Sequence, residues 1–372
     1  MKPIRRPAAA VAVVITATAG LLVGSGILTG AASAATTFIG PLNTETVVAS
    51  TVPVSGPEAG DVNPYGVAVV QRSMGNLTAG NVLVSNFNNA ANAQGTGSTI
   101  VQVTPGGRQS VFATVPSLGG ACPGGIGLTT ALVALPTGWV IVGSLPTQNG
   151  MISGPGCLIV LDSHGVVRET IAGHGIDGPW DMTAVNLGSV SELFVTNVLG
   201  GILGKANPDG GTVQRLVLTT GPGLPRLLAS TRIGSGFPAR TDPNALVIGP
   251  TGVGFANNTL YVADTLDNRI AAIPDAGLRG TSAGPGRTVT KGGALNGPLG
   301  LAIAPNGNIL TVNGDDGNIV ETTPFGRQAA VKTIDNNSGG GGNLFGLAVK
   351  PGADAVYFVD DFGSDNNLQL FH

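Results

Sequence analysis

Short apolar runs separated by Gly, Pro and Asn fill most of this chain. An opening phrase recurs six times: a small residue, a variable residue and, in five copies, Gly, all followed by an apolar stretch; the copies begin near residues 63, 124, 178, 249, 297 and 343. A second apolar run follows each phrase and ends in a small polar or acidic residue. Short apolar runs bounded by turn residues are typical of buried strands. The pattern therefore predicts six repeated units of short strands.

Further short runs supply third and fourth strands, such as 99–103 and 108–114. Four strands per unit and starts spaced 46 to 71 residues apart predict an all-β, six-bladed β-propeller over residues 35–372. The last unit reaches only a third strand, at 367–371. A free strand at 45–50 is expected to complete that unit and to close the ring, which removes an open sheet edge.

The segment from Tyr261 to Ile270, Tyr-Val-Ala-Asp-Thr-Leu-Asp-Asn-Arg-Ile, resembles the core of an NHL repeat. More distantly, the chain is similar to gluconolactonase, to regucalcin-like lactonases and to virginiamycin B lyase, which are all six-bladed propellers. The lactonase resemblance implies a divalent metal held by one Glu, two Asn and one Asp at one face. No Glu stands at the opening of the first unit, and Glu58 is the nearest substitute, so this departure argues against lactonase activity.

Residues 1–34 resemble an export signal. Lys2, Arg5 and Arg6 precede an apolar stretch that ends in Ala-Ser-Ala, a pattern typical of a cleavage site. We therefore expect a secreted protein with no membrane association after cleavage. Without these residues, 15 of the 18 basic residues remain against 21 acidic ones. This balance gives no basic stripe for a phosphate backbone and excludes nucleic acid as a partner.

The variable residues of the opening phrases are expected near the top face, where the first strand of each unit starts and to which the second strand returns. Three of them are aromatic, namely Tyr65, Trp180 and Phe345. The second strands end there too, among others at Asn86 and Asn313. Polar groups that converge in an apolar hollow are typical of a ligand pocket, and we predict that these five residues bind a ligand. Alternatively, the aromatic residues plug the channel as core.

Asp181 stands where the other five opening phrases have Gly. A carboxylate at the channel mouth needs a partner or a cation. Ca²⁺ prefers oxygen ligands, and we predict a calcium site from Asp181, Asn197, Asp264 and Asp360. The alternative is that the polar strand ends only cap the following turns, as the NHL resemblance implies for Asp264.

The two cysteines, Cys122 and Cys157, fall in loops of the second unit that belong to the same face. Because export permits oxidation, we predict that they form a disulfide.

These features favour a secreted, monomeric binding or scaffold module that takes a small molecule or an extracellular polymer at its top face. A metal-dependent hydrolase or lyase of a small lactone-like or carbohydrate-like substrate is the alternative, and a recognition module for cell-wall or matrix material is a third. A bound metal and a buried acid–base pair would favour the enzyme, whereas a dry channel plugged by aromatic residues would favour the scaffold.

Overall fold

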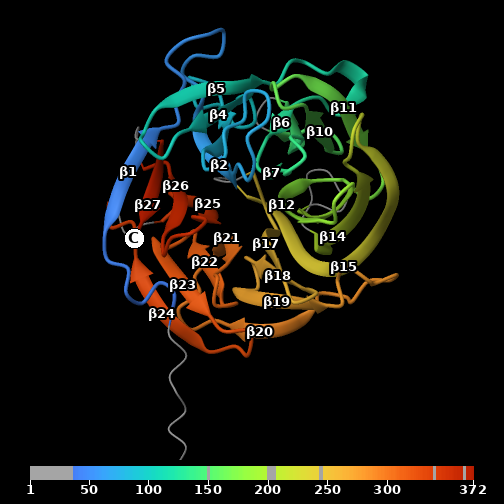
Figure 1. Ribbon diagram of the computed structural model, residues 1–372. Helices are drawn as coiled ribbons and strands as arrows, with labels where there is room; N and C mark the ends of the chain where they lie inside the picture. Colours follow the sequence, from blue (N-terminus) through green and yellow to red (C-terminus); the bar gives the residue numbers. More distant parts are fainter. Residues whose placement is uncertain (1–36, 149–150, 199–206, 243–245, 338–340, 363–365) are drawn as a thin grey trace, which may run out of the picture. The chain divides into compact units, whose positions relative to one another are not determined.

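The computed structural model describes residues 37–148, 151–198, 207–242, 246–337, 341–362 and 366–372. Six antiparallel sheets surround a central channel in this part of the chain (Figure 1). The predicted all-β, six-bladed propeller is therefore confirmed. The predicted export signal lies outside the described residues. Within them, no helix has the length and apolarity needed to span a bilayer.

Blades 1, 4 and 5 have the four strands that the sequence pattern predicts. Blade 1 consists of β2 (Val62–Val69), β3 (Val82–Asn88), β4 (Thr99–Val103) and β5 (Gln109–Thr114). Blade 4 consists of β17 (Pro250–Ala256), β18 (Thr259–Asp264), β19 (Arg269–Pro274) and β20 (Arg287–Lys291). Blade 5 consists of β21 (Pro298–Ile303), β22 (Ile309–Asn313), β23 (Asn318–Thr322) and β24 (Gln328–Thr333).

Blades 2 and 3 depart from the regular pattern. Blade 2 consists of β6 (Gly127–Leu128), β7 (Leu132–Ala134), β8 (Val140–Gln148), β9 (Met151–Ile152), β10 (Cys157–Leu161) and β11 (Val167–Ala172). Its innermost strand is split, because β6 and β7 pair with different parts of β8. Blade 3 consists of β12 (Pro179–Asn186), β13 (Val190–Asn197), β14 (Asn207–Thr219), β15 (Arg226–Asp242) and β16 (Leu246–Ile248).

Strand β1 (Glu45–Ser50) closes the ring in blade 6, beside β27 (Asn367–Phe371), β26 (Val356–Asp360) and β25 (Leu344–Val349). The register runs from Glu45 opposite Phe371 to Ser50 opposite Asn367. The backbone of His372 adds three hydrogen bonds with Asn43 and Thr44. The predicted closure is therefore confirmed, and Figure 1 shows β1 at the outer edge of this blade.

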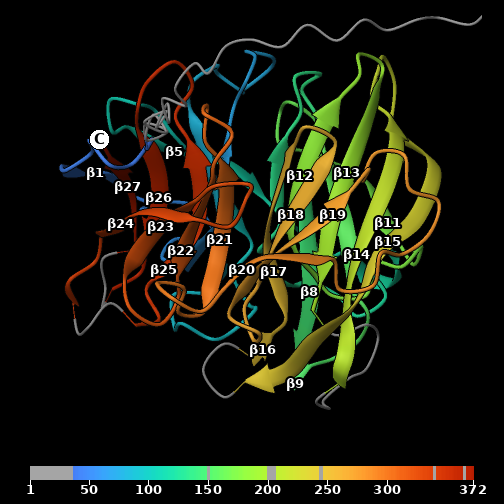
Figure 2. The ribbon, with the colours of Figure 1, turned by 90° about the horizontal axis from the view of Figure 1, so that it is seen from below.

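The antiparallel order of the strands defines two faces of the propeller. Turns between first and second strands and between third and fourth strands lie at the bottom face. Turns between second and third strands and the links between blades lie at the top face, which points down in Figure 2. The innermost strands start at the top face, as predicted.

The core lies between adjacent blades. Strands β3 and β10 are buried along their whole length, since a neighbouring blade covers each face of their sheets. Leu83 and Ile100 of blade 1 share one apolar cluster with Val142 of blade 2. Sheets covered on both faces produce continuous apolar runs, which is why the sequence shows runs rather than alternation.

The predicted disulfide between Cys122 and Cys157 is confirmed, with the two Cα atoms 5.5 Å apart. Cys122 follows the short 3-10 turn η1 (Gly119–Ala121), and Cys157 begins β10. Both are fully buried in the cluster between blades 1 and 2. The bridge therefore ties the loop that enters blade 2 to the middle of that blade.

Loss of this bridge should lower the free energy of unfolding by about 3–4 kcal/mol, because the crosslink restricts a loop of this length in the unfolded chain. Denaturant unfolding of the Cys122→Ala/Cys157→Ala variant, compared with the oxidised and the reduced wild type, measures this. Two reactive thiols in denatured, unreduced protein would contradict the bridge.

Candidate functional site

Asp181 occupies a position that in other blades allows close contact between inner strands. A Cβ atom added at Gly300 would collide with the carbonyl oxygen of Phe345, and one added at Gly346 would collide with that of Tyr65. Gly252 is confined in the same way by the backbone of Leu299. These glycines let each inner strand touch the strand of the next blade. Blade 3 has a carboxylate instead.

The Asp181 carboxylate joins blade 3 to blade 4. Its Oδ1 accepts a hydrogen bond from the backbone N–H of Met182 at 2.8 Å, and its Oδ2 accepts one from that of Val253, in β17, at 3.0 Å. Thr196 supports the same joint, since its hydroxyl accepts from Asp181 N–H and donates to the carbonyl oxygen of Thr251. The side chain that interrupts the glycine pattern is thus fixed by two donors.

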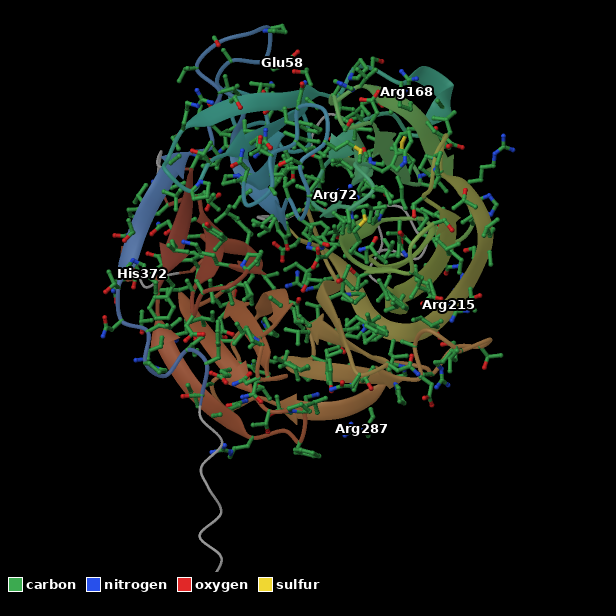
Figure 3. All side chains as sticks on the ribbon, in the orientation of Figure 1. Glu58, Arg72, Arg168, Arg215, Arg287 and His372 are labelled. Carbon is green, nitrogen blue, oxygen red and sulfur yellow. A yellow bond between two sulfur atoms is a disulfide. The ribbon has the colours of Figure 1, made fainter. Side chains whose placement is uncertain are left out.

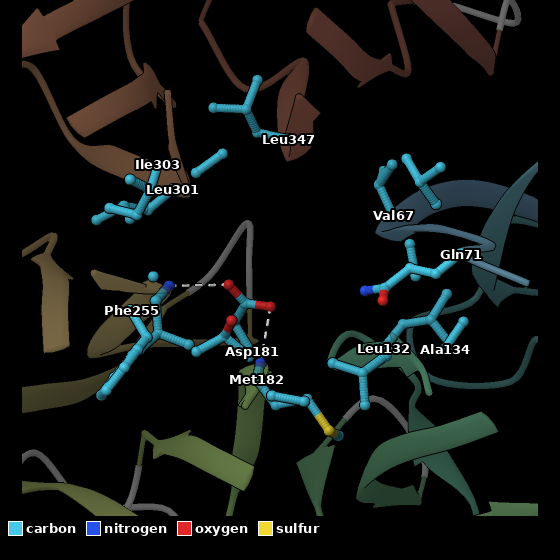
Figure 4. A pocket seen from close by; sticks show the side chains of 18 of the residues that line it. Val67, Gln71, Leu132, Ala134, Asp181, Met182, Phe255, Leu301, Ile303 and Leu347 are labelled. Carbon is cyan, nitrogen blue, oxygen red and sulfur yellow. Dashed lines mark hydrogen bonds between the residues drawn. The ribbon is translucent and has the colours of Figure 1, made fainter. Parts of the chain in front are cut away.

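A cavity of about 250 Å³ occupies the channel next to Asp181. Its lining comes from the innermost strands of all six blades, and Asp181 is the one ionisable side chain among the described residues that line it. Most of the other lining side chains are apolar, including Leu132, Phe255 and Leu347. Figure 4 shows Asp181 and Gln71 pointing toward one another across this space. The cavity therefore offers one acid, the carboxamides of Gln71 and Asn186 and the hydroxyl of Thr183 among mostly apolar side chains.

Burial raises the pKa of Asp181 to about 7, although the two N–H donors favour its charged form. An ordinary Asp has a pKa of about 3.9 in an unfolded chain. The folded protein therefore holds an extra proton between about pH 4 and 7, and its stability falls as the pH rises through that window. Burial also raises the pKa of Asp361 to about 7 and that of Asp264 to about 6. These two groups therefore also make the folded protein less stable as the pH rises.

The Asp181→Asn variant should lose the contribution of Asp181 to this pH dependence. The melting temperature of the wild type, relative to that of the variant, should therefore fall between about pH 4 and pH 7. Melting curves of both proteins across this range measure the difference. A difference that is independent of pH would mean that Asp181 does not titrate there.

The three aromatic residues predicted to bind a ligand pack against one another. Tyr65 lies 5.6 Å from Trp180 and 5.1 Å from Phe345 between ring centroids, and the Trp180 indole N–H donates to the Tyr65 hydroxyl at 2.7 Å. Tyr65 and Trp180 are each only 4% exposed. Burial, reinforced by the charge of Asp181, raises the pKa of Tyr65, which therefore remains neutral. This aromatic plug corresponds to the alternative stated from the sequence.

The polar strand ends also have local partners. Asn86 donates to the carbonyl oxygen of Thr51 and to the Thr99 hydroxyl. The Asn197 side-chain oxygen accepts from two backbone N–H groups, those of residues 177 and 178. Asn313 donates to the carbonyl oxygen of Ala294 and to the Asp316 carboxylate. These carboxamides fasten the top-face loops, and none of them lines the described cavity.

The carboxylates predicted to join Asp181 are engaged in their own blades. Asp264 forms a buried ion pair with Arg269 at 2.8 Å. Asp360 accepts from the backbone N–H of Phe362 and from the Gln369 carboxamide. The described residues contain no group of three or more His, Cys, Asp or Glu side chains that could hold a metal ion. The structure therefore does not bring the predicted acidic ligands together, and the residues present do not fit the predicted calcium site.

The cavity itself was not predicted, and its position differs from the expected top-face pocket. Neither the aromatic residues nor Asn86 and Asn313 line it, whereas Gln71, which follows the inner strand of blade 1, does. No sequence signal marks Gln71, because its relation to Asp181 depends on how blades 1 and 3 face each other across the channel.

No protein-family model and no curated protein matches this sequence. In structure, the chain is similar to a gluconolactonase from Xanthomonas campestris, with 11% identity, a TM-score of 0.54 and 90% of each chain covered. It is similar to the calcium-binding protein regucalcin from Agrobacterium tumefaciens, with 13% identity, a TM-score of 0.50, and 87% of this chain and 94% of that one covered. It is also similar to a PQQ-bound aldose sugar dehydrogenase from Streptomyces coelicolor, with 16% identity, a TM-score of 0.54, and 88% and 97% covered.

The predicted likeness to gluconolactonase and regucalcin is thus confirmed as a likeness of fold. Virginiamycin B lyase from Staphylococcus aureus, also predicted, matches with a TM-score of 0.47 and 14% identity. At such low sequence identity, the similarity shows a shared fold only. Any activity of this chain has to be argued from its own residues. What the comparisons show is a six-bladed β-propeller whose structural neighbours include enzymes.

Proposed function

We propose that this chain is a secreted, NHL-like binding propeller that holds a small molecule in its central channel. The observation that carries the proposal is the Asp181 carboxyl group, the one ionisable group among the described lining residues of a mostly apolar cavity. The volume of about 250 Å³ lies near the lower end of the range for ligand pockets, which is roughly 300–1,000 Å³. A ligand with an apolar body and one cationic or hydrogen-bonding group would match this lining.

The same cavity lacks the second acid–base group and the metal ligands that the enzyme alternative requires. General acid–base catalysis needs groups that can take up and return a proton at the substrate, and the described lining has Asp181 alone. The metal-dependent form of that alternative also finds no group of acidic ligands among the described residues. The aromatic plug supports a binding or scaffold role, because it fills the top-face centre with the protein's own side chains.

Titration with n-butylammonium, followed by calorimetry, tests the proposal. Wild type should bind this probe at about pH 8.5 and bind it at least tenfold more weakly at about pH 5.5, where the Asp181 carboxyl is neutral. The Asp181→Asn variant should bind about 10- to 100-fold more weakly at the higher pH, since a hydrogen bond to a charged group contributes about 1.5–3 kcal/mol. Equal affinities, or no binding by wild type, would refute the channel as the binding site.

A second measurement addresses calcium and catalysis. Melting curves with millimolar Ca²⁺ and with chelator should coincide, because a cation that bound only the folded state would raise its stability. Gluconolactone should not be hydrolysed above the uncatalysed rate in the presence of Ca²⁺. A calcium-dependent shift that disappears in Asp181→Asn, together with lactone hydrolysis, would favour the enzyme instead.

A further inference from the structure

The bottom-face turns of blades 1 to 5 share a feature that the channel does not explain. In each of these blades, one such turn presents a large exposed apolar side chain with an arginine one or two residues away. The pairs are Met74 with Arg72, Val166 with Arg168, Leu224 with Arg226, Leu278 with Arg279, and Phe325 with Arg327. Two of the apolar side chains are almost fully exposed, Leu278 at 80% and Phe325 at 97%. Solvated apolar side chains in five successive blades indicate a surface rather than isolated exceptions.

A backbone contact joins the turns of blades 1 and 2, and a contact from strand β14 reaches the turn of blade 4. The backbone N–H of Asn76, in the turn of Met74, donates to the carbonyl oxygen of Ser163, in the turn that leads to Val166. Arg215 of blade 3 donates to the carbonyl oxygens of Ala276 and Gly277, immediately before Leu278. Each of the five turns joins a first to a second strand or a third to a fourth strand, so the pairs lie on one face, which points up in Figure 2. Figure 3 labels two of their arginines, Arg72 and Arg168.

Charge divides the two faces of the propeller. The described top-face links contain eight acidic residues and no Lys or Arg; the acidic residues are Glu58, Asp61, Asp177, Asp267, Asp315, Asp316, Asp335 and Asp361. The bottom-face turns contain five basic and three acidic residues, namely Arg72, Arg108, Arg279, Arg327 and Lys350 against Asp162, Asp275 and Asp354. Arg168 and Arg226 add two more cations at the start of the following strands, and Arg168 lies 3.7 Å from Asp162. The strand ends of the top face carry Arg240, Arg269 and Lys291, and each of these pairs with an Asp carboxylate. Because the bottom face is net positive and the top face is net negative, an anionic surface would attract the bottom face.

We propose that this bottom face, defined by the five pairs above, docks onto an anionic lipid bilayer. Exposed apolar side chains enter the boundary between headgroups and acyl chains, while the arginines beside them bind lipid phosphates. A soluble polyanion would use the arginines but would leave Leu278 and Phe325 in water. The sequence expectation of no membrane association concerned removal of the apolar export signal, and this proposal concerns peripheral contact only.

Co-sedimentation with vesicles tests the proposal, with neutral phosphatidylcholine vesicles compared with vesicles in which about a third of the lipid is phosphatidylglycerol. The wild type should bind only the anionic vesicles, and less tightly as salt increases. Arg226→Gln/Arg327→Gln should weaken binding about thirtyfold, two charges at about 1 kcal/mol each. Leu278→Ser/Phe325→Ser should weaken it at least tenfold, since each side chain buries apolar surface.

The matched control is Val54→Ser, which removes an equally exposed apolar side chain, 90% accessible, from a top-face link. It should leave vesicle binding unchanged. Equal binding to neutral vesicles, no binding to anionic ones, or equal loss in the control would overturn the proposal. So would binding that soluble polyphosphate abolishes and that the apolar variants do not affect, because that outcome identifies a phosphate site rather than a bilayer surface.

Discussion

A chain that begins at residue 53 should fail to fold cooperatively. It lacks β1, so the outer edge of β27 loses its backbone hydrogen bonds to that strand. It also lacks Phe38, Ile39 and Leu42, which are buried in the apolar cluster of blades 5 and 6. Burial of three such side chains contributes about 5–9 kcal/mol, which is comparable with the whole stability of a typical domain. The N–H groups of Phe38 and Ile39 also donate to the Glu321 carboxylate, at 2.9 and 2.8 Å.

Denaturant unfolding followed by circular dichroism measures this loss. As a control, a synthetic peptide of residues 37–52 added to the truncated chain should restore a cooperative transition, because it supplies the same strand and the same buried side chains. If the truncated chain melts like the full-length protein without the peptide, closure by β1 is not needed for stability.

Gly346→Ala should destabilise the protein by about 3 kcal/mol or more, the upper end of the range for overpacking. The added methyl group would collide with the carbonyl oxygen of Tyr65 and lie 2.8 Å from a methyl carbon of Val67, at the joint between blades 6 and 1. Its effect should reach the aromatic plug, because Tyr65 carries the acceptor for the Trp180 indole. Denaturant unfolding and tryptophan fluorescence measure the two consequences.

Gly280→Ala is the matched control, since no atom lies within 4 Å of its added Cβ and neither glycine has a positive φ. It should change stability by no more than about 0.5 kcal/mol, as is usual for surface positions. Similar effects of the two substitutions would mean that the cost does not come from contact between inner strands.

The fold could be predicted because its signals are local. Each strand is a short apolar run between turn residues, and the strand predicted at 45–50 matches β1 in its bounds. The split of the blade 2 inner strand was missed, since the buried polar residues Thr129 and Thr130 interrupt an otherwise apolar run. The segment 37–44 carries no strand pattern, and its anchoring depends on Glu321, nearly 300 residues away.

The candidate site could be predicted only in part, because it is formed by residues from different blades. The break in the glycine pattern identified Asp181 as unusual, but not its partner Val253. The aromatic residues were expected at one mouth of the channel, and they do meet, yet only the structure shows that they fill the space between them. Distances between blades are set by packing around the whole ring, and a single sequence does not contain them.

The pairing of β1 with β27 also determines when the fold can be completed. Glu45 pairs with Phe371, more than 300 residues later in the sequence, so the ring cannot close until residues 367–371 have been synthesised. Until then, β1 remains unpaired, and an unpaired strand that is apolar tends to aggregate. Its sequence, Glu-Thr-Val-Val-Ala-Ser, includes three polar residues, and four of its six side chains are exposed even in the finished blade. Its polar composition therefore lets β1 stay solvated while it is unpaired.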